Sequence, residues 1–497
     1  MRAFLFTCLL VLVELLEGTD PSYSGLVFCF FMLNVFAFNA AGGFSRPSGA
    51  YIFFYAVLAV EVGTVYKALL GEPAQSNLQA PLLTMSLYVA SIAGMLVAVY
   101  LARRIATTTT GIAGIMNVRS FNYFEAALGA LALYFALTLA PFVLPGNGGQ
   151  ILHSLLILNP FMPLSMLLGT IAAVKDSRGT RSTSVLTVLS MTYFFIEGGL
   201  MTFSKQGMFT PAACWVIGVA WARFRLRFVH IAVLGAFMVF AYMALVPMAQ
   251  IGRDAVVTGT AEERIGLVEG YLSDIPALRR DAAAFEIPAD FDRRMLYYNR
   301  PQGLMDRLSM LPNDSVLIQW TNQGHLFGYL ALRFYFENWM PHLIDPHKLE
   351  GLKVGGNAYM HEMGGLAEAD ETTGISFSAT AEAFHIDGWR AILVIAPLIW
   401  FMLFLTCDAT CGDIRNQPLG LLYVLLFAHV APEGALGGAI ESVRIGNVAA
   451  ALGIFFCGYV APVLGLLLRG RPLVRENRVM HRPVSGPFLS PASESPS

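Results

Sequence analysis

Two short stretches in the second half of the sequence carry the residue types that acid–base chemistry uses. Glu382 and His385 are three residues apart, so their side chains share a face if this stretch is helical. His361 and Glu362 are adjacent in a glycine-rich stretch, where neighbouring side chains point in different directions. A carboxylate or an imidazole beside an attacking hydroxyl serves as a general base. The alternatives are an interfacial helix for the first pair and a solvated acidic patch for the second.

Two lysines indicate a second kind of chemistry, the binding of phosphate groups. Lys205 stands in a polar break, SKQG, between two apolar runs. A lysine beside the N-terminus of the following helix is a point charge suited to a phosphate. Lys348 ends the stretch PHLIDPHK, in which two prolines indicate an ordered turn. The alternative for Lys205 is an anchor in the lipid headgroups, and the alternative for Lys348 is a solvated turn.

No metal or cofactor motif accompanies these residues. Cys407 and Cys411 form a pair with neither a second cysteine pair nor a nearby histidine to complete a metal site. The sequence contains no P-loop, no Rossmann glycine pattern and no HExxH motif. We therefore predict no cofactor and no metal, although Glu382 and His385 together are of a type that holds a divalent ion.

The elements that must position these residues are membrane helices. Hydrophobic residues make up 56% of the 497 and charged residues 13%, whereas a soluble domain is about 25% charged. Apolar runs of roughly 18 to 22 residues recur, each long enough to cross a bilayer, and in lipid such runs are helical. We predict an all-α polytopic membrane protein with about twelve spans. Glu61 and Glu197 are expected to face the interior of the helix bundle.

Charge separates one large loop from the rest of the chain. Residues 250–388 hold twenty acidic and eleven basic residues, while the remainder sums to +7. Arginines concentrate in the connections that we assign to the cytoplasm, and both termini are placed there. Helical spacing over 260–278 indicates that the loop is mostly helical. The predicted parts are spans one to nine in 1–248, the loop in 249–387, spans ten to twelve in 388–468, and a basic, then disordered tail in 469–497.

Four motifs carry a resemblance to a known family. They are NAAGG followed by Arg46, TFSKQG at 202–207, PHLIDPHK at 341–348 and TGISFSATAEAFHIDGW at 373–389. Together with the topology, they resemble the O-antigen polymerase (Wzy-type) and oligosaccharide repeat unit polymerase family, within the larger group that includes O-antigen ligases. The histidine-rich form of the third motif departs from the family pattern.

The resemblance implies a glycosyltransferase of the bacterial inner membrane that joins oligosaccharide repeats linked to undecaprenyl diphosphate, on the periplasmic face. Its implied partners are that lipid-linked donor, membrane lipid, a chain-length regulator and a flippase, and no nucleic acid. The resemblance implies Glu382 as the general base, with His361 and His385 as further candidates. The expected diphosphate ligands are Lys205, Lys348 and Arg46, and the expected sugar contacts are Asn357, Tyr359 and Thr373.

Three alternatives to a polymerase stay open. A ligase would use the same donor and transfer the finished glycan to another acceptor. A transporter or flippase for lipid-linked sugars is disfavoured by the single large loop and by the lack of visible repeats with broken helices. A structural membrane scaffold is the remaining alternative.

Overall fold

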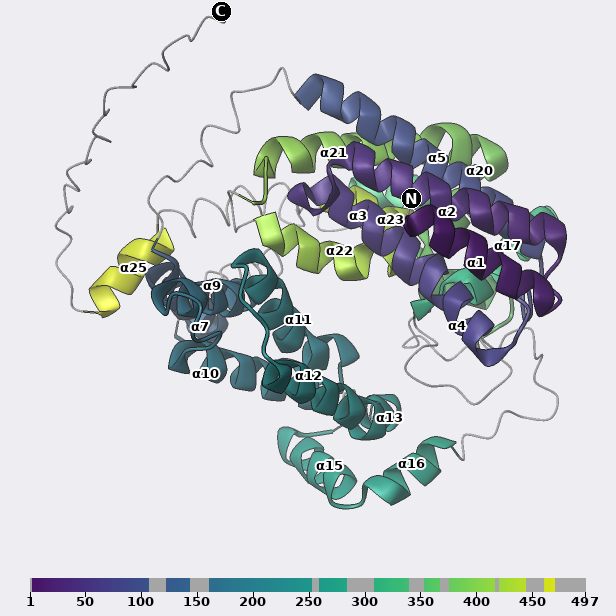
Figure 1. The fold of residues 1–497 in the computed structure, drawn as a ribbon. Helices are drawn as coiled ribbons and strands as arrows, with labels where there is room; N and C mark the ends of the chain where they lie inside the picture. Colours follow the sequence, from purple (N-terminus) through teal and green to yellow (C-terminus); the bar gives the residue numbers. More distant parts are fainter. Residues whose placement is uncertain are drawn as a thin grey trace, which may run out of the picture.

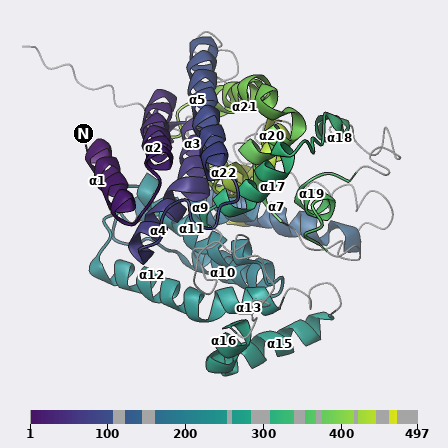
Figure 2. The ribbon, with the colours of Figure 1, turned by 90° about the vertical axis from the view of Figure 1, so that its right-hand side faces the viewer.

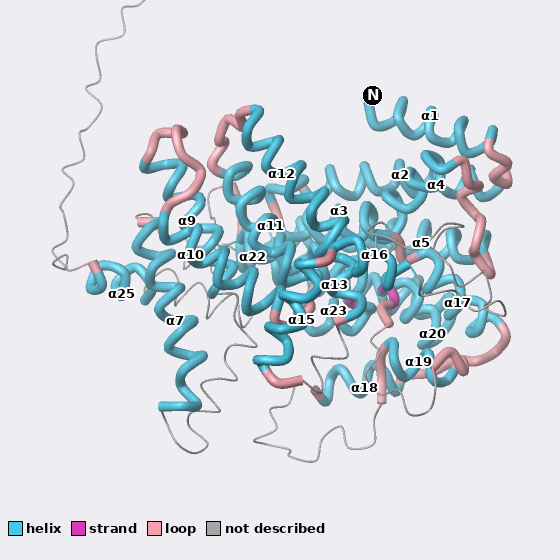
Figure 3. Tube along the Cα trace, turned by 90° about the horizontal axis from the view of Figure 1, so that it is seen from below, coloured by secondary structure: helices cyan, strands magenta, loops and turns pink. Residues whose placement is uncertain are grey.

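The chain folds as an all-α membrane protein. The computed structural model describes residues 2–106, 122–143, 161–252, 259–283, 308–338, 353–366, 375–415, 420–443 and 460–469. These residues are almost entirely helical, with one short strand (Figure 3). Six helices among them are long and apolar enough to cross a membrane. They cover Pro21–Ser45, Pro47–Leu70, Pro81–Ile105, Tyr123–Ala140, Phe228–Ala249 and Ala379–Cys411. The count of about twelve spans stays a prediction.

The helices form two groups (Figure 1). The first group consists of α1 (Arg2–Leu16), α2 (Pro21–Ala41), η1 (Gly43–Ser45), α3 (Pro47–Ala56), η2 (Val57–Glu61), α4 (Val62–Leu70), α5 (Pro81–Ala106), α17 (Leu311–Asn322), α18 (Leu330–Glu337), α19 (Gly356–Glu362), β1 (Phe377–Ser378), α20 (Ala379–Arg390), η8 (Ala391–Ile395), α21 (Ala396–Cys411), α22 (Leu421–Glu433) and α23 (Ala435–Glu441). The second consists of α7 (Tyr123–Val143), α9 (Phe161–Asp176), α10 (Val185–Phe194), η4 (Phe195–Leu200), α11 (Lys205–Trp221), α12 (Phe228–Phe240), η5 (Ala241–Leu245), α13 (Val246–Ile251), α15 (Ala261–Ser273), α16 (Ile275–Ala283) and α25 (Ala461–Leu468). The Trp221 indole donates to the Ile414 carbonyl at 2.9 Å and so links α11 to the end of α21.

Local sequence signals set the ends of α2 and α15. The Asp20 carboxylate accepts from the backbone N–H groups of Ser22 and Tyr23, and Pro21 occupies the first turn of α2. Gly42 ends that helix in the left-handed conformation, with φ of 89°. In the predicted loop, Thr260 and Glu263 form a reciprocal capping box at the start of α15. The segment 260–278, which its spacing predicts to be helical, therefore lies in the two helices α15 and α16.

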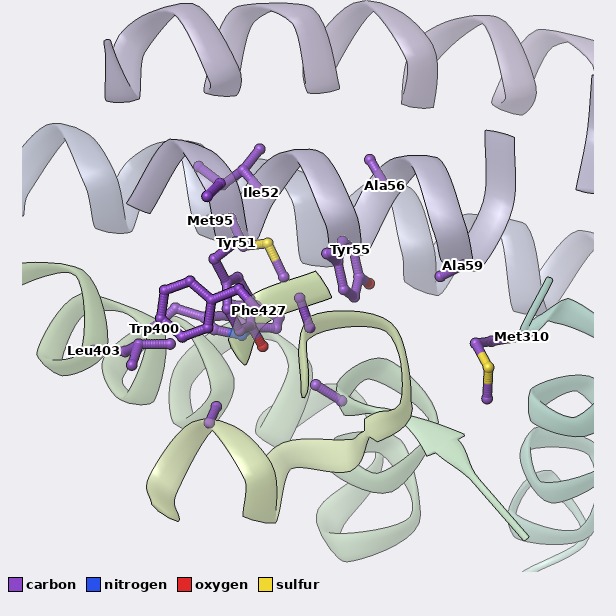
Figure 4. Packing of buried hydrophobic residues seen from close by; sticks show 14 of the residues in the cluster. Tyr51, Ile52, Tyr55, Ala56, Ala59, Met95, Met310, Trp400, Leu403 and Phe427 are labelled. Carbon is purple, nitrogen blue, oxygen red and sulfur yellow. The ribbon is translucent and has the colours of Figure 1, made fainter. Parts of the chain in front are cut away.

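Interlocking aromatic side chains join α3, α21 and α22 in the first group. Tyr51 lies with its ring centroid 5.2 Å from that of Phe427 and 5.7 Å from that of Phe404. One helical turn further, Tyr55 packs edge-on against Trp400 at 6.4 Å. All five side chains are buried, and Figure 4 shows Tyr51, Trp400 and Phe427 converging between the helices. In a membrane, contacts of this kind stabilise helix association through close packing.

Two helices of the first group are broken, and the apolar runs of the sequence do not predict these breaks. Non-helical backbone at Asp387 and Gly388 interrupts α20 near its end, before the apolar helix continues through η8 and α21. Gly434 ends α22, and Ala435 then takes a left-handed φ of 50° before α23 begins. The start of α20 meets the second break, because Phe377 and Ser378 form parallel bridges to Gly434 and Ala435. Extended backbone at this place inside a membrane protein is tolerated because it is surrounded by protein.

The predicted loop packs on the same end of the first group as these breaks. Figure 2 shows α17, α18 and α19 gathered beside α20. The Ala80 N–H, at the start of α5, donates to the Ser315 hydroxyl of α17 at 2.9 Å. Further along α5, the Ser91 hydroxyl accepts from the Thr380 hydroxyl at 2.8 Å. Ser91 is about 15 Å from the start of α5 at 1.5 Å per residue, so α20 begins well inside the bundle. We call this end of the first group the loop end.

Glycines allow a close crossing of α7 and α25 in the second group. A Cβ at Gly465 would lie 2.1 Å from the Glu125 carbonyl oxygen, and one at Gly129 would lie 1.9 Å from the Ala461 carbonyl oxygen. The two helices therefore contact each other backbone to backbone, as small residues permit in membrane proteins.

We predict that Gly465→Ala destabilises the protein, because the new methyl group forces α25 away from α7. Overpacking of this kind costs about 1–3 kcal/mol. Gly235→Ala on α12 is the matched control, since a Cβ there meets no atom within 4 Å. The melting temperature of the detergent-solubilised protein measures both. A Gly465→Ala variant that melts with or above the control would contradict the crossing.

Candidate functional site

Glu382 lies at the centre of the polar contacts between the loop helices and the membrane helices. Its side chain is fully buried. One carboxylate oxygen, Oε1, accepts hydrogen bonds from the Tyr335 and Tyr359 hydroxyls, each at 2.6 Å. The other, Oε2, accepts from the backbone N–H groups of Leu436 and Gly437 at 2.7 and 2.9 Å. Four donors, from α18, α19 and α23, therefore surround this carboxylate.

The local backbone explains how these donors converge. Ser378 caps α20 by accepting from the N–H groups of Thr380 and Ala381, which puts Glu382 in the first turns of that helix. A Cβ at Gly437 would lie 2.2 Å from the Tyr335 ring. Only glycine lets that ring lie directly against the first turn of α23, so the Tyr335 hydroxyl reaches Glu382.

The two tyrosines are held as hydrogen-bond donors. Burial raises the pKa of the Tyr335 hydroxyl, and the nearby negative charge of Glu382 raises it further. The same two causes, in the same order, raise the pKa of Tyr359. Both hydroxyls therefore keep their protons at any physiological pH, and both protons are directed at the Glu382 carboxylate.

A second buried group, His385, lies one turn along α20. Its Nδ1 is 2.9 Å from the Thr321 hydroxyl of α17. Its Nε2 faces the Glu362 carboxylate of α19 at 3.5 Å. The Tyr359 ring packs edge-on against the imidazole with centroids 5.0 Å apart, so Tyr359 contacts both Glu382 and His385. The Phe327 N–H also donates to the His385 carbonyl at 2.9 Å, which ties the loop backbone to α20.

Asp314 anchors α17 to the start of α20. Its fully buried carboxylate accepts from the Ser378 N–H at 3.0 Å, from the Ser378 hydroxyl and from the Tyr88 hydroxyl of α5. Burial raises the pKa of Asp314 to about 6, although the hydrogen bonds from Ser378 and Tyr88 oppose that rise.

The structure brings together three of the residues expected at the site, namely Glu382, His385 and Tyr359. His361 and Asn357 are half-buried on α19, the helix that supplies Tyr359. Lys348 and Thr373 lie outside the described residues. The roles expected for all of these residues stay predictions.

Lys205 and Arg46 lie elsewhere. Lys205 is the first residue of α11, in the second group of helices, behind the N-cap Ser204. Arg46 precedes α3, and its guanidinium is 4.0 Å from the Asp408 carboxylate, which also accepts from the Ser48 N–H and hydroxyl. Asp408 lies near the end of α21, far along the chain from α20. Arg46 therefore takes part in the contact with Asp408, and its expected role as a diphosphate ligand stays a prediction.

Several residues of the cluster were not singled out from the sequence. Tyr335 and Thr321 lie in an apolar and aromatic stretch, 311–336, where nothing in the spacing separates them from packing residues. Glu362 was recognised as a base type, but its partner His385 was not foreseen. Among the described residues, no group of three or more histidine, cysteine, aspartate or glutamate side chains is arranged to hold a metal ion.

Comparison with known proteins finds no match for this chain among family models, curated proteins or solved structures.

We predict that Asp314 makes the stability of the protein depend on pH. Its pKa is raised from 3.8 to about 6, so the folded state binds an additional proton between these values. The resulting stabilisation is complete below about pH 4 and is lost as the pH rises through about 6, with a magnitude of about 3 kcal/mol. Asp314→Asn cannot ionise, so its melting temperature relative to wild type should rise between pH 4 and pH 7.

The control for this measurement is Asp281→Asn, at an exposed position of α16. Its melting temperature should follow the wild type at every pH. A constant difference between Asp314→Asn and wild type across this range would show that the carboxylate is not the titrating group.

Proposed function

We propose that this protein is a glycan polymerase that joins oligosaccharide repeats carried on undecaprenyl diphosphate. The observation that supports this proposal best is the polar cluster at the loop end. There, helices of the acidic loop place tyrosine, histidine and carboxylate side chains against a break in the membrane helices. Hydroxyl and carboxylate groups beside aromatic rings are the surroundings that a sugar needs, and the apolar helices next to them suit a polyprenyl tail.

The reaction would place the donor diphosphate and the acceptor sugar on different helix groups. A diphosphate is a good leaving group, so a cation that stabilises its developing charge matters more than a general acid. Lys205, at the start of α11, is our choice for that cation, with Lys348 as a second candidate. The acceptor sugar would lie against α19, where Asn357 and Tyr359 are candidates for contact, with Thr373 nearby in the chain.

The hydrogen bonds favour His385 over Glu382 as the proton acceptor. Glu382 already accepts from four donors, which leaves no lone pair directed at a substrate hydroxyl. We assign to Glu382 the role of positioning the two tyrosines and α23. His361 stays a candidate, since it is half-buried on the helix that faces His385.

We also propose how the chain is oriented in the membrane. Twelve spans, cytoplasmic termini and a periplasmic loop would put the Glu382 cluster on the face of the bacterial inner membrane where lipid-linked repeats are presented. The Arg46–Asp408 contact would then face the cytoplasm, in agreement with the arginine-rich connections on that side. A flippase would supply the substrate, and a chain-length regulator would be the natural partner.

We predict that a cysteine introduced at Arg280 is labelled from the periplasmic side. The parent for this experiment is a variant without native cysteines, and the thiol reagent is one that cannot cross the membrane. Arg280 is exposed on α16, within the acidic loop. Arg178→Cys, in the exposed turn after α9, should react only after the cells are opened. Labelling of Arg280→Cys only in opened cells would overturn both the topology and the proposed reaction.

We predict that Lys205→Ala abolishes polymer formation, whereas Lys205→Arg retains part of it because the positive charge remains. Removal of a group that stabilises leaving-group charge costs about 100-fold or more in rate. The assay uses purified protein in lipid nanodiscs with an undecaprenyl-diphosphate-linked repeat unit and follows product length on a gel. Arg280→Ala, at an exposed cation of the acidic loop, is the control and should leave the rate unchanged. Full-length polymer from Lys205→Ala would show that this lysine is only a membrane anchor.

One observation favours a second function, the transport of a lipid-linked sugar. No broken helices were visible in the sequence, but the breaks at Gly388 and Gly434 are of the kind on which transporters build substrate sites. Proteoliposomes with a fluorescent lipid-linked oligosaccharide in one leaflet separate the two functions. A polymerase lengthens the glycan in that leaflet, whereas a transporter moves it across the bilayer at unchanged length.

A further inference from the structure

The tautomer of His385 follows from the hydrogen bonds of Thr321. The Thr321 hydroxyl donates its only proton to the Leu317 carbonyl at 2.8 Å. Toward His385 Nδ1, at 2.9 Å, the same hydroxyl must therefore accept. Nδ1 then carries a hydrogen atom, and in the neutral imidazole Nε2 presents a bare lone pair. Among the residues that the structure describes, this buried Nε2 has no hydrogen-bond partner.

The bare nitrogen and a carboxylate oxygen converge on one position. Nε2 lies 3.5 Å from Glu362 Oε2, longer than an ordinary hydrogen bond, and both atoms are close enough to contact a single donor. The His385 side chain is 1% exposed and that of Glu362 is 35% exposed. A substrate hydroxyl would have to reach this position from the side of Glu362, the more exposed of the two groups.

We propose that Glu362 and His385 together accept the proton of the attacking sugar hydroxyl, and that Thr321 is the positioning residue for the imidazole. This inference rests on the proposed polymerase function. In the step, the hydroxyl O–H bond breaks, its proton passes to Nε2, and the oxygen forms the new bond to the anomeric carbon of the donor. The bond from that carbon to the diphosphate oxygen breaks, and its electron pair leaves with the diphosphate. The proton then passes through Glu362 to water.

The surroundings of the imidazole suit this role. Thr321 fixes one nitrogen, and the Tyr359 ring holds the imidazole plane from the side. Glu362 stabilises the imidazolium that forms, as a carboxylate does beside a catalytic histidine. The titratable groups that surround His385 are Glu362 and Tyr359 of α19, Glu382 one turn earlier on α20, and His325 in the turn after α17.

Activity of Glu362→Gln against a matched control is the first test. In nanodiscs with the lipid-linked repeat unit, Glu362→Gln should lower kcat about 100-fold, within the range that general-base catalysis contributes, with little change in KM. Glu337→Gln is the control, since the Glu337 carboxylate is 34% exposed on the neighbouring α18 and pairs with Arg333. Thr321→Val should lower kcat, and Thr321→Ser should restore it. A Glu362→Gln rate within twofold of wild type would overturn the proposal.

A spectroscopic test of the pair does not depend on the reaction. In protein labelled with ¹⁵N-histidine, the signal lost in His385→Gln identifies His385. Its ¹⁵N shifts should show a protonated Nδ1 in wild type and in Thr321→Ser, and a changed tautomer ratio in Thr321→Val. A protonated Nε2 in neutral wild-type His385 would overturn the assignment. If wild-type protein forms no polymer while these shifts are as expected, the polymerase function fails and the geometry of the pair stands.

Discussion

The hydrogen bonds on the Glu382 carboxylate are the constraint on which the loop end depends. A buried charge without partners costs several kcal/mol, so all of its donors must be in place at once. Those donors come from α18, α19 and α23, segments that are distant in sequence. These hydrogen bonds therefore fix the loop helices against the membrane helices.

The broken helices and the buried carboxylates are parts of one arrangement. A break leaves backbone N–H groups without partners in their own helix, and a membrane interior offers no water to replace them. At the start of α23 the N–H groups of Leu436 and Gly437 donate hydrogen bonds to the Glu382 carboxylate. At the start of α20 the Ser378 N–H donates to the Asp314 carboxylate. Each carboxylate thus satisfies the start of a helix, and each helix start supplies donors that stabilise a carboxylate.

Composition and apolar run length were enough to predict an all-α membrane protein, because the demand for backbone hydrogen bonding in lipid leaves few alternatives. Helical spacing over 260–278 also predicted helix in the loop, where Thr260 caps α15. The breaks could not be predicted in the same way. Gly434 lies in an apolar run with many small residues, and what makes it a break is a bridge to Phe377, a contact between distant segments. Tyr335 was not predicted for the same reason. Its hydrogen bond to Glu382 depends on Gly437, a residue of a distant segment that leaves room for the tyrosine ring.

Glu382 and His385 illustrate why a buried polar residue near a site need not take part in the chemistry. Both are buried on the same face of α20, and the spacing alone gives them equal claim to be a base. Their surroundings differ, because every donor around Glu382 is already committed to it, whereas His385 keeps one nitrogen without a partner among the described residues. Loss of the two side chains would therefore act by different routes. Loss of Glu382 leaves tyrosine hydroxyls and backbone N–H groups unpaired and loosens the fold, while loss of His385 removes a group that can still accept a proton. The chemistry is therefore to be sought at the atom whose hydrogen-bonding capacity the fold leaves unused.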